Sequence, residues 1–359
     1  MEEIKLMKGN EAIAEAAIRC GCDGYFGYPI TPQSEVLETL MALEPWKKTG
    51  MVVLQAESET ASINMVYGGA ACGKRAMTSS SSPGISLMQE GLSYIAGAEL
   101  PCVVVNVTRG GPGLGTIQPS QSDYFQTVKG GGHGDYKLIT LAPASVQEMA
   151  DYTCLAFDLA FKYRNPVMVL SDGLIGQMME KVQLPDYKPR LTDAEIREKY
   201  PWATLGKQGR THRNIITSLA LVSEEMEKVN DRLQKKYREV EANEVRFETF
   251  LCDDADYILV AFGSSARICQ KSVEILRTEG VKVGLFRPIT LYPYPFKQLH
   301  EYAKHVKGML SVEMSAGQMV EDVRLAVNGL VPVEFYGRYG GMIPTPEEIV
   351  TALKEKLMA

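Results

Sequence analysis

Short apolar runs alternate along this chain with longer segments whose apolar residues recur every three or four positions. Runs of the first kind are typical of strands buried on both faces, and segments of the second kind are typical of amphipathic helices. The predicted strands cover residues 24–28, 51–54, 75–78, 102–107 and 166–170, and the predicted helices cover residues 10–19, 33–41, 59–71, 86–96 and 146–162. Asn10 is expected to cap the first helix. The alternation indicates an α/β fold with a mostly parallel sheet and helices on both faces.

The pattern changes after Val182. Residues 184–209 are rich in proline and charge, which is typical of a connecting arm. Residues 215–245 predict one long helix with a single apolar stripe, which suits a subunit contact, an interdomain strut or docking on its own domain. A second α/β unit begins at Tyr257. We therefore expect three parts, namely residues 1–183, 184–250 and 251–359.

Composition narrows the class of protein. The 359 residues are 45% hydrophobic and 23% charged, which is ordinary for a soluble globular protein. A net charge of -6 argues against a nucleic-acid partner, because such proteins present basic patches to phosphates. The acidic N-terminus is unlike a signal peptide, and no apolar run reaches the length of a membrane span. We expect a cytoplasmic protein that binds neither nucleic acid nor a membrane.

The seven cysteines are too scattered for a metal or iron–sulfur ladder. Cys20 and Cys22 lie close together, whereas the others are isolated in sequence. Reduced thiols packed as small hydrophobic groups are the better interpretation. Any iron–sulfur chemistry would then come from another polypeptide.

Polar residues follow three of the predicted strands. YPITP at 28–32 follows the first, QAESE at 55–59 the second, and Arg109 the fourth. Because open parallel sheets place their chemistry at the carboxyl ends of the strands, these segments are expected to form one site. A hydroxyl, two carboxylates and an arginine would suit an anionic substrate held near a carboxylate.

Phosphate-binding motifs are not found in the sequence. Gly73-Lys74-Arg75 lacks the glycine spacing and the hydroxyl residue of a P-loop, and the glycine-rich segment 111–115 opens no helix and contains Pro112. A Gly-Asp-Gly segment followed by asparagine, expected of a Mg²⁺-diphosphate site for thiamine, is also missing. If this protein uses a diphosphate cofactor, the phosphates are held by another chain.

Longer stretches resemble one family. YPITPQSE, QAESETASINMVYGGAACGKRAMTSSSSPGISLMQEGLSYIAGAELPCVVVNVTRGGPGLG and QPSQSDYFQTVKGGGHGD are similar to the α subunit of 2-oxoacid:ferredoxin oxidoreductases. The similarity is greatest to the branched-chain type that acts on 3-methyl-2-oxobutanoate (2-oxoisovalerate). It covers about residues 5–182, and FRPITLYPYP and SVEMSAGQMVEDV extend it through the C-terminal part.

The resemblance implies a division of labour between subunits. Residues 1–183 would be the pyrimidine-binding domain for thiamine diphosphate, and residues 251–359 would resemble a transketolase C-terminal domain. A separate β subunit would hold the diphosphate and Mg²⁺. Iron–sulfur clusters would lie on partner subunits, with γ and ferredoxin-like δ subunits expected. The complex would use coenzyme A and ferredoxin to convert a 2-oxoacid to an acyl-CoA.

The same resemblance implies roles for single residues. Glu59 would be the catalytic carboxylate that exchanges a proton with the aminopyrimidine ring, and Glu57 competes for this role. Either acid could instead simply favour the positive end of a helix. Glu59 is preferred because Gly68 and Gly73 follow it at spacings similar to those of the family.

Substrate binding would fall to two further residues. Arg109 matches the arginine that clamps the substrate carboxylate, because a guanidinium can donate two parallel hydrogen bonds. Thr31 matches a substrate-binding hydroxyl, although a turn or helix cap is an alternative role. Pro29, Ile30 and Ser81 are expected to contact the cofactor. The run of serines at 79–82 departs from the Ser-Thr-Ser-Gly common in the wider family, which leaves individual serine roles open.

Other polar residues have mainly structural interpretations. His133 could shuttle protons, but a loop histidine among glycines is more often an ordinary exposed residue; Asp123 and Asp135 lie in or beside the same loop. Glu313 and Gln318 match family positions but suit a hydrogen-bonded domain contact, and Asp172 is expected to cap a turn.

The alternative functions are the same reaction on 2-oxoglutarate, half of a non-redox thiamine enzyme such as a split transketolase, and a non-catalytic scaffold subunit.

Overall fold

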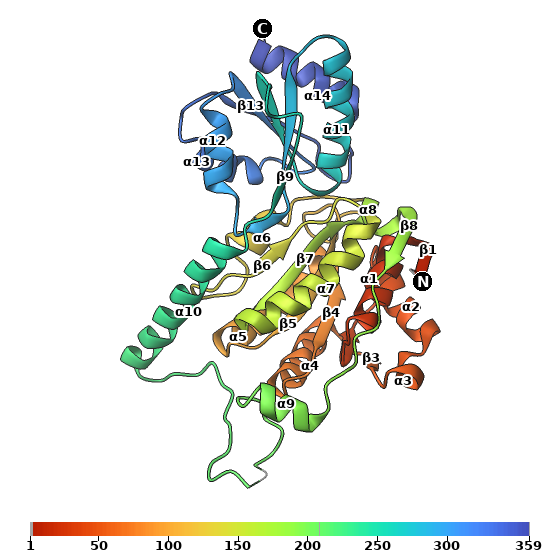
Figure 1. The fold of residues 1–359 in the computed structure, drawn as a ribbon, viewed down its shortest axis with the longest axis vertical. Coiled ribbons are helices and arrows are strands. Elements are labelled where there is room, and N and C mark those ends of the chain that lie inside the picture. Colours follow the sequence, from red (N-terminus) through yellow and green to blue (C-terminus); the bar gives the residue numbers. More distant parts are fainter. Residues whose placement is uncertain (1–2, 208, 359) are drawn as a thin grey trace.

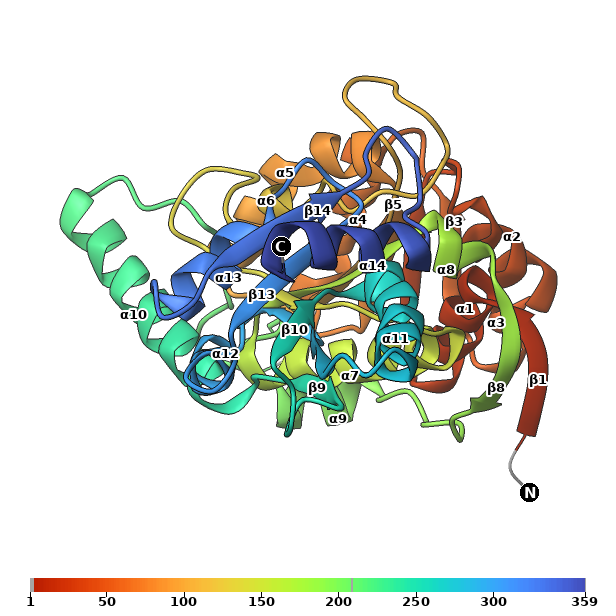
Figure 2. The same cartoon turned by 90° about the horizontal axis from the view of Figure 1, so that it is seen from above.

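Two sheets, one above the other, organise the molecule (Figure 1). The computed structural model describes residues 3–207 and 209–358. A seven-stranded sheet forms the lower part; six of its strands come from the first half of the chain and one, β12 (Thr290–Tyr292), from the last third. A five-stranded sheet from the last third forms the upper part. Seen from above, the upper unit lies over the lower one, and the helix α10 (Ser223–Asn243) projects to one side (Figure 2). No helix in the described ranges is long and apolar enough to cross a membrane.

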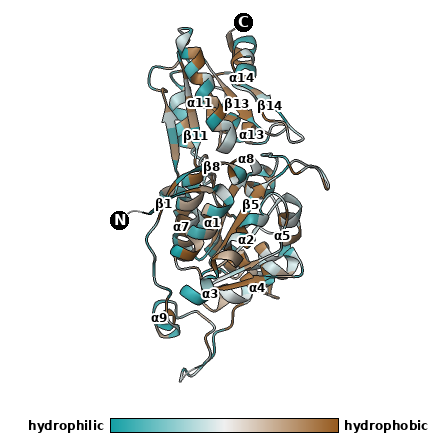
Figure 3. Ribbon diagram, turned by 90° about the vertical axis from the view of Figure 1, so that its right-hand side faces the viewer, coloured by the Kyte–Doolittle hydropathy of each residue, from teal (hydrophilic) through white to brown (hydrophobic). Residues whose placement is uncertain are grey.

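The larger sheet has the strand order β12-β6-β7-β5-β4-β2-β3. Six of its strands are parallel, as the alternating pattern predicts. They are β2 (Gly24–Gly27), β3 (Val52–Gln55), β4 (Ala76–Ser80), β5 (Cys102–Thr108), β6 (Ile139–Leu141) and β7 (Pro166–Asp172). β5 and β7 are buried at every residue, which explains their uninterrupted apolar runs. Hydrophobic residues gather on the strands of this sheet (Figure 3).

Helices cover both faces of this sheet. α1 packs against α7 on one face, and α4 packs against α5 on the other. The helices of this unit are α1 (Gly9–Arg19), α2 (Ser34–Leu43), α3 (Pro45–Lys48), α4 (Glu59–Ala71), α5 (Ser82–Gly97), α6 (Tyr124–Val128), α7 (Val146–Tyr163) and α8 (Gly173–Gln177). The prediction that Asn10 caps α1 is wrong, because Lys8 occupies the cap position and Asn10 lies inside the helix.

The smaller sheet has the order β14-β13-β10-β11-β9, and only β9 runs antiparallel. Its strands are β9 (Phe247–Phe250), β10 (Tyr257–Val260), β11 (Val283–Pro288), β13 (Gly308–Glu313) and β14 (Val333–Gly337). Its helices are α11 (Gly263–Thr278), α12 (Phe296–Ala303), α13 (Met319–Val327) and α14 (Pro346–Leu353), and a π-helical turn, Lys354–Met358, follows α14. β12 (Thr290–Tyr292) leaves this unit and pairs antiparallel with β6, an exchange that the sequence pattern does not predict.

Buried polar contacts join the two units where their sheets meet. The Ser264 hydroxyl donates to both carboxylate oxygens of Asp172, at 2.7 and 2.6 Å. Arg287 on β11 donates to Glu148 on α7 with two nitrogens, at 2.9 and 2.7 Å. Gln121 donates to the Phe262 carbonyl at 2.8 Å. These contacts hold the C-terminal unit over the carboxyl end of the larger sheet.

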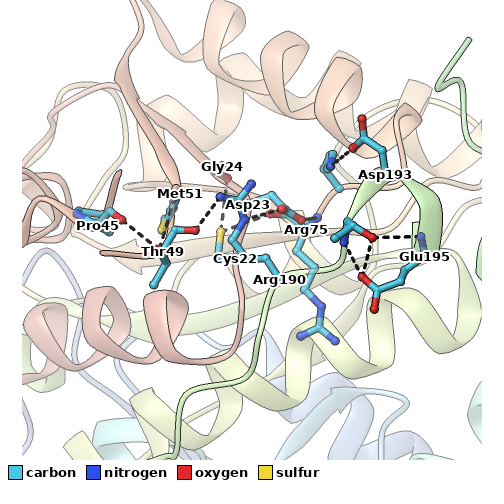
Figure 4. A network of polar contacts seen from close by, with 12 residues as sticks. Cys22, Asp23, Gly24, Pro45, Thr49, Met51, Arg75, Arg190, Asp193 and Glu195 are labelled. Atoms are coloured by element: carbon cyan, nitrogen blue, oxygen red, sulfur yellow. Dashed lines mark hydrogen bonds and ion pairs between the residues drawn. The ribbon is translucent and has the colours of Figure 1, made fainter. Parts of the chain in front are cut away.

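An arm leaves the first unit and is tied back onto it. β1 (Glu3–Lys8) pairs antiparallel with β8 (Met179–Leu184), and α9 (Asp193–Lys199) follows. Between them, Arg190 donates to the Asp23 carboxylate at 2.7 Å and to the Thr49 carbonyl at 2.9 Å (Figure 4). Lys74 pairs with Asp193 at 2.6 Å. Charged residues of the predicted connecting arm therefore anchor it to the first unit.

The long helix is shorter than predicted. α10 covers Ser223–Asn243, and residues 215–222 contain no regular secondary structure. Leu219 and Val222, which belong to the predicted stripe, are 69% and 54% exposed. Leu233, Tyr237 and Val240 are the buried residues of the helix and dock it on its own chain.

Candidate functional site

The three predicted segments, together with Ser80 and Ser81, follow neighbouring strands. In the order β5-β4-β2-β3, the segment after each strand carries in turn Arg109, Ser81, Thr31 and Glu59. One contact joins two of them directly, because Arg109 Nη1 donates to the Thr31 carbonyl at 2.9 Å. The carboxyl edge of the larger sheet thus brings together the residues that sequence analysis assigns to one site.

Arg109 is held from several sides. Its side chain is buried, at 7% exposure, and Nη2 donates to the Leu114 carbonyl at 3.1 Å. Its backbone N–H donates to the Ser82 hydroxyl at 3.1 Å. Its Nε is buried without a hydrogen-bond partner among the described residues. A guanidinium carries five N–H donors, so this side chain retains capacity for an anion.

The loop of Thr31 is positioned by groups that sequence analysis does not identify. Asn10 donates to the Pro32 carbonyl at 2.7 Å and Gln177 donates to the same oxygen at 3.2 Å. Thr31 itself is exposed in a turn, and Gln33, not Thr31, stands at the cap position of α2. The hydroxyl of Thr31 is therefore not used to cap this helix.

A buried polar chain supports the same loop from beneath. Tyr25 and Ser79 share a hydrogen bond of 2.7 Å, and Ser79 donates to the Gln33 side chain at 2.6 Å. Gln33 in turn donates to the Tyr28 carbonyl at 3.2 Å. Pro29 and Ile30 therefore sit on a loop fixed at both ends. The only sign of this network in the sequence is Tyr25, a residue with a hydroxyl inside an apolar run.

Glu59 and Glu57 occupy different environments. Glu59 is the first residue of α4 and is 6% exposed, whereas Glu57 is exposed in the preceding loop. Ser58 caps the helix by accepting from the Ala61 N–H at 3.1 Å. In the part of the chain that the structure describes, no group donates a hydrogen bond to the Glu59 carboxylate. A buried carboxylate at a helix N-terminus is favoured by the helix dipole and remains able to bind a ligand.

Gly84 makes room for this carboxylate. A Cβ at position 84 would lie 2.6 Å from Glu59 Oε1 and 2.1 Å from Ser80 Oγ. Both distances are far below van der Waals contact, so only glycine lets the first turn of α5 approach Glu59. The sequence shows a Pro-Gly pair here but does not indicate what the glycine touches.

Unpartnered hydroxyls lie on β4 and directly after it. The hydroxyl groups of Thr78, Ser80 and Ser81 are buried and have no hydrogen-bond partner among the described residues. Native proteins leave few buried polar atoms unpaired, and an unpaired one can mark a place where a ligand or water binds. The Ser80 hydroxyl and the Glu59 carboxylate both lie against Gly84, so this pair of unpartnered groups fits a surface that receives a polar ligand.

A cleft of about 490 Å³ opens beside Arg109, between the two units. Its wall from the first unit includes Ser82, Arg109 and Asp123, and its wall from the second includes Gln318 and Tyr339. Burial raises the pKa of the Asp123 carboxyl, although hydrogen bonds from Ser82 and Asn106 act in the opposite direction. The arrangement offers one fixed cation and one carboxyl of raised pKa to a small anionic ligand.

The remaining polar residues have structural contacts. Asp172 caps α8 through the Leu174 and Ile175 N–H groups, as predicted, and also joins the two units. Gln318 donates to the Ser122 carbonyl at 2.8 Å, which makes it the predicted domain contact. His133 and Asp135 are exposed and line a different cleft.

Two family models match this chain. The model described as pyruvate flavodoxin/ferredoxin oxidoreductase, thiamine diphosphate-binding, matches residues 15–247. The model of pyruvate:ferredoxin oxidoreductase core domain II matches residues 255–349. The chain belongs to the 2-oxoacid:ferredoxin oxidoreductase family.

Named relatives of this oxidoreductase agree with the models. The ketoisovalerate oxidoreductase subunit VorB of Methanothermobacter thermautotrophicus is 50% identical over 98% of this chain and 97% of its own length. The 2-oxoglutarate synthase subunit KorA of Methanothermobacter marburgensis is 37% identical over 98% of this chain and 99% of its own length. Both relatives are named as subunits, which indicates multi-subunit enzymes.

Solved structures show the same fold. The 2-oxoglutarate:ferredoxin oxidoreductase from Magnetococcus marinus matches with a TM-score of 0.85 and 28% identity over 99% of this chain. Our chain spans 66% of that chain. A split-gene transketolase matches with a TM-score of 0.61 over 98% of both chains, but at 12% identity this likeness shows the fold alone. The predicted α/β fold of the thiamine-diphosphate and transketolase type is confirmed.

The residues on the edge of the larger sheet fit the pyrimidine half of thiamine diphosphate. That ring needs a carboxylate and polar partners in a sheltered place. Glu59 and the unpartnered hydroxyls of Ser80 and Ser81 provide such groups.

Proposed function

We propose that this chain is the α subunit of a thiamine-diphosphate-dependent 2-oxoacid:ferredoxin oxidoreductase that prefers branched-chain substrates such as 2-oxoisovalerate. The reaction would convert the 2-oxoacid, coenzyme A and two oxidised ferredoxins to an acyl-CoA, carbon dioxide, a proton and two reduced ferredoxins. The observation that supports this substrate class is sequence identity. The chain is 49–50% identical to two ketoisovalerate oxidoreductase subunits, but only 36–38% identical to four 2-oxoglutarate synthase subunits.

We propose that the cofactor is shared between subunits. The β subunit would hold the diphosphate and Mg²⁺, because this sequence lacks a Mg²⁺-diphosphate motif. Iron–sulfur clusters would lie on partner subunits, with γ and δ subunits completing the complex and passing electrons to ferredoxin. Within this chain, residues 1–183 would form the pyrimidine-binding part, 184–250 the arm and long helix, and 251–359 the C-terminal domain.

Glu59 would act on the pyrimidine ring. When bound, thiamine diphosphate supplies the carbon nucleophile that decarboxylates 2-oxoacids. Glu59 would hold a proton at one carboxylate oxygen and exchange it with a ring nitrogen. Pro29, Ile30 and Ser81 would contact the same ring. The support for Glu59 over Glu57 is its burial at the start of α4.

Arg109 and Thr31 would bind the substrate. The guanidinium would donate to the carboxylate of the 2-oxoacid, and the Thr31 hydroxyl would donate to an oxygen of the same molecule. Their proximity through the 2.9 Å hydrogen bond supports a joint role. A scaffold subunit without catalytic function would not require this constellation.

The substrate class can be tested with the assembled complex. Acyl-CoA formation would be measured from 2-oxoisovalerate, 2-oxoglutarate, pyruvate and indolepyruvate. We expect the highest kcat/KM with 2-oxoisovalerate. A higher value with 2-oxoglutarate would overturn the proposed specificity, and activity that survives substitution of Glu59, Arg109 and Thr31 by alanine would favour a scaffold.

The shared cofactor site can be tested with the isolated chain. Calorimetry with thiamine diphosphate and Mg²⁺ should show negligible binding, and the chain should purify colourless and free of iron. Mixing with the β subunit should produce binding. Tight stoichiometric binding to the isolated chain would mean that the cofactor site is complete within this polypeptide.

A further inference from the structure

One cavity in the described part of the chain lies away from the proposed active site. It has a volume of about 640 Å³ and forms where the end of α10 meets β12, α12, α13 and the loop before β6. It shares no lining residue with the cleft of Arg109. A cavity of this size is ordinary for a small-molecule site. We name it the α10 cleft; its lining is drawn mainly from residues 128–137, 238–245 and 291–298, together with Asp322.

Positive charge dominates the α10 cleft. Four cationic side chains and two carboxylates line it. Lys129 is paired with Asp322, and the Glu241 carboxylate accepts from the Tyr292 hydroxyl at 3.0 Å. The other three cations, Lys137, Arg238 and Lys297, form no ion pair within the described ranges.

These three cations come from separate elements. Arg238 is on α10, Lys297 is on α12, and Lys137 precedes β6. Like charges held around one cavity repel each other, and an anion between them would relieve this repulsion. The chain has a net charge of -6, so the concentration of positive charge here is not a general property of its surface.

Aromatic rings form the apolar wall. Tyr292 and Tyr294 are 9% and 4% exposed, and the Tyr294 and Phe296 rings lie 5.0 Å apart. The Lys137 ammonium group lies 5.8 Å from the centre of the Tyr292 ring. A planar ring can pack against such a wall while its charged group reaches the cations.

We propose that the α10 cleft binds a ligand of the nucleoside diphosphate class, with its diphosphate between Lys137, Arg238 and Lys297 and its base against the aromatic wall. The class follows from the combination of separated cations and aromatic side chains in one cavity.

ADP is the probe for the test, and isothermal titration calorimetry on the full chain is the measurement. We expect one site per chain. Pyrophosphate should bind more weakly because it lacks the ring, and adenosine more weakly because it lacks the charge. Arg238→Gln and Lys297→Gln should each weaken ADP binding about tenfold, the effect expected when a charged hydrogen-bond partner is lost. Lys235→Gln, on the exposed side of α10, is the matched control and should leave binding unchanged.

Three outcomes would overturn the proposal. The first is no ADP binding to the full chain. The second is ADP binding that Arg238→Gln, Lys297→Gln and Lys235→Gln leave equally unchanged. The third is binding to the isolated chain that is lost when the partner subunits are added, because the cleft would then be a subunit contact. All three variants change exposed side chains, so circular dichroism should confirm an unaltered fold.

Discussion

Glu59 and Glu313 are two buried glutamates at the carboxyl ends of the two sheets, and they are used in opposite ways. Glu59 is 6% exposed and Glu313 is fully buried. Glu313 accepts five hydrogen bonds, from the hydroxyls of Ser311 and Ser315 and from the backbone N–H groups of Gln318, Met319 and Val320. Glu59 accepts none from the described residues, and the unpartnered hydroxyl of Ser80 lies beside the same glycine, Gly84.

Hydrogen-bond satisfaction separates a structural carboxylate from a functional one. A buried carboxylate whose oxygens are all engaged stabilises the fold and has no capacity for a ligand. A buried carboxylate without donors is costly to the folded chain unless a ligand or partner completes it. Sequence alone ranks both residues as family matches, and only their hydrogen bonds distinguish them.

The strongest test of the contrast is Glu59→Gln. An amide cannot take part in proton exchange, so turnover of the assembled complex should fall by about 10³-fold while the melting temperature changes little. Steady-state rates and thermal unfolding would be measured together. Glu57→Gln is the matched control, and a greater loss of turnover in that variant would reverse the assignment of the two residues.

The opposite behaviour is expected for Glu313→Gln. The amide group would face N–H donors, leaving several of them unpaired, and the free energy of unfolding should fall by about 3 kcal/mol or more. Urea denaturation would measure the loss. Glu321→Gln, on the exposed side of α13, should have almost no effect. If Glu313→Gln abolished turnover without lowering stability, the contrast between the two glutamates would be wrong.

A smaller effect is expected at Arg109. Arg109→Met should lower kcat/KM for the 2-oxoacid, mainly by raising KM, because the substrate carboxylate loses its partner. The loss should correspond to about 2–4 kcal/mol of transition-state stabilisation. Arg109→Lys should recover only part of this, since an ammonium group cannot form two parallel hydrogen bonds. Loss of thiamine diphosphate affinity with an unchanged KM would remove Arg109 from the substrate site.

The smallest effect concerns the contact between the units. Burial raises the pKa of Glu148, but hydrogen bonds and charge from Arg287 outweigh it, and the net pKa is lowered. A carboxyl with a lowered pKa in the folded state contributes stability above its unfolded pKa of about 4.3, and this contribution is lost as pH falls through the lower folded value.

Glu148→Gln should therefore lower stability by about 1–2 kcal/mol at pH 7, and the difference from the native protein should shrink below about pH 4. Melting temperatures of both proteins across this range are the measurement. A difference that is constant with pH would show that the ion pair does not contribute in this way.

Much of the architecture is determined locally. The helix Glu59–Ala71 begins and ends at the predicted residues, because a serine cap, helical spacing and a Gly-Lys stop all lie within one segment. β5 and β7 follow from uninterrupted apolar runs that only a doubly covered strand can bury. The order of strands and their carboxyl-end loops then brings Thr31, Glu59 and Arg109 to one edge.

What the tertiary structure alone decided depends on contacts between distant segments. β12 pairs with β6 although Thr290 and its partner Leu141 are far apart in the sequence, and no local pattern specifies that pairing. Residues 215–222 have helical spacing, but most of their apolar side chains (Ile215, Leu219, Leu221 and Val222) stay exposed, so packing does not support a helix there. The roles of Gly84 beside Glu59, and of Glu59 against Glu57, likewise follow from three-dimensional approach. The periodicity of apolar residues predicts which side chains share one face of a helix or strand. Burial and hydrogen-bond satisfaction depend on the partner that folding brings near.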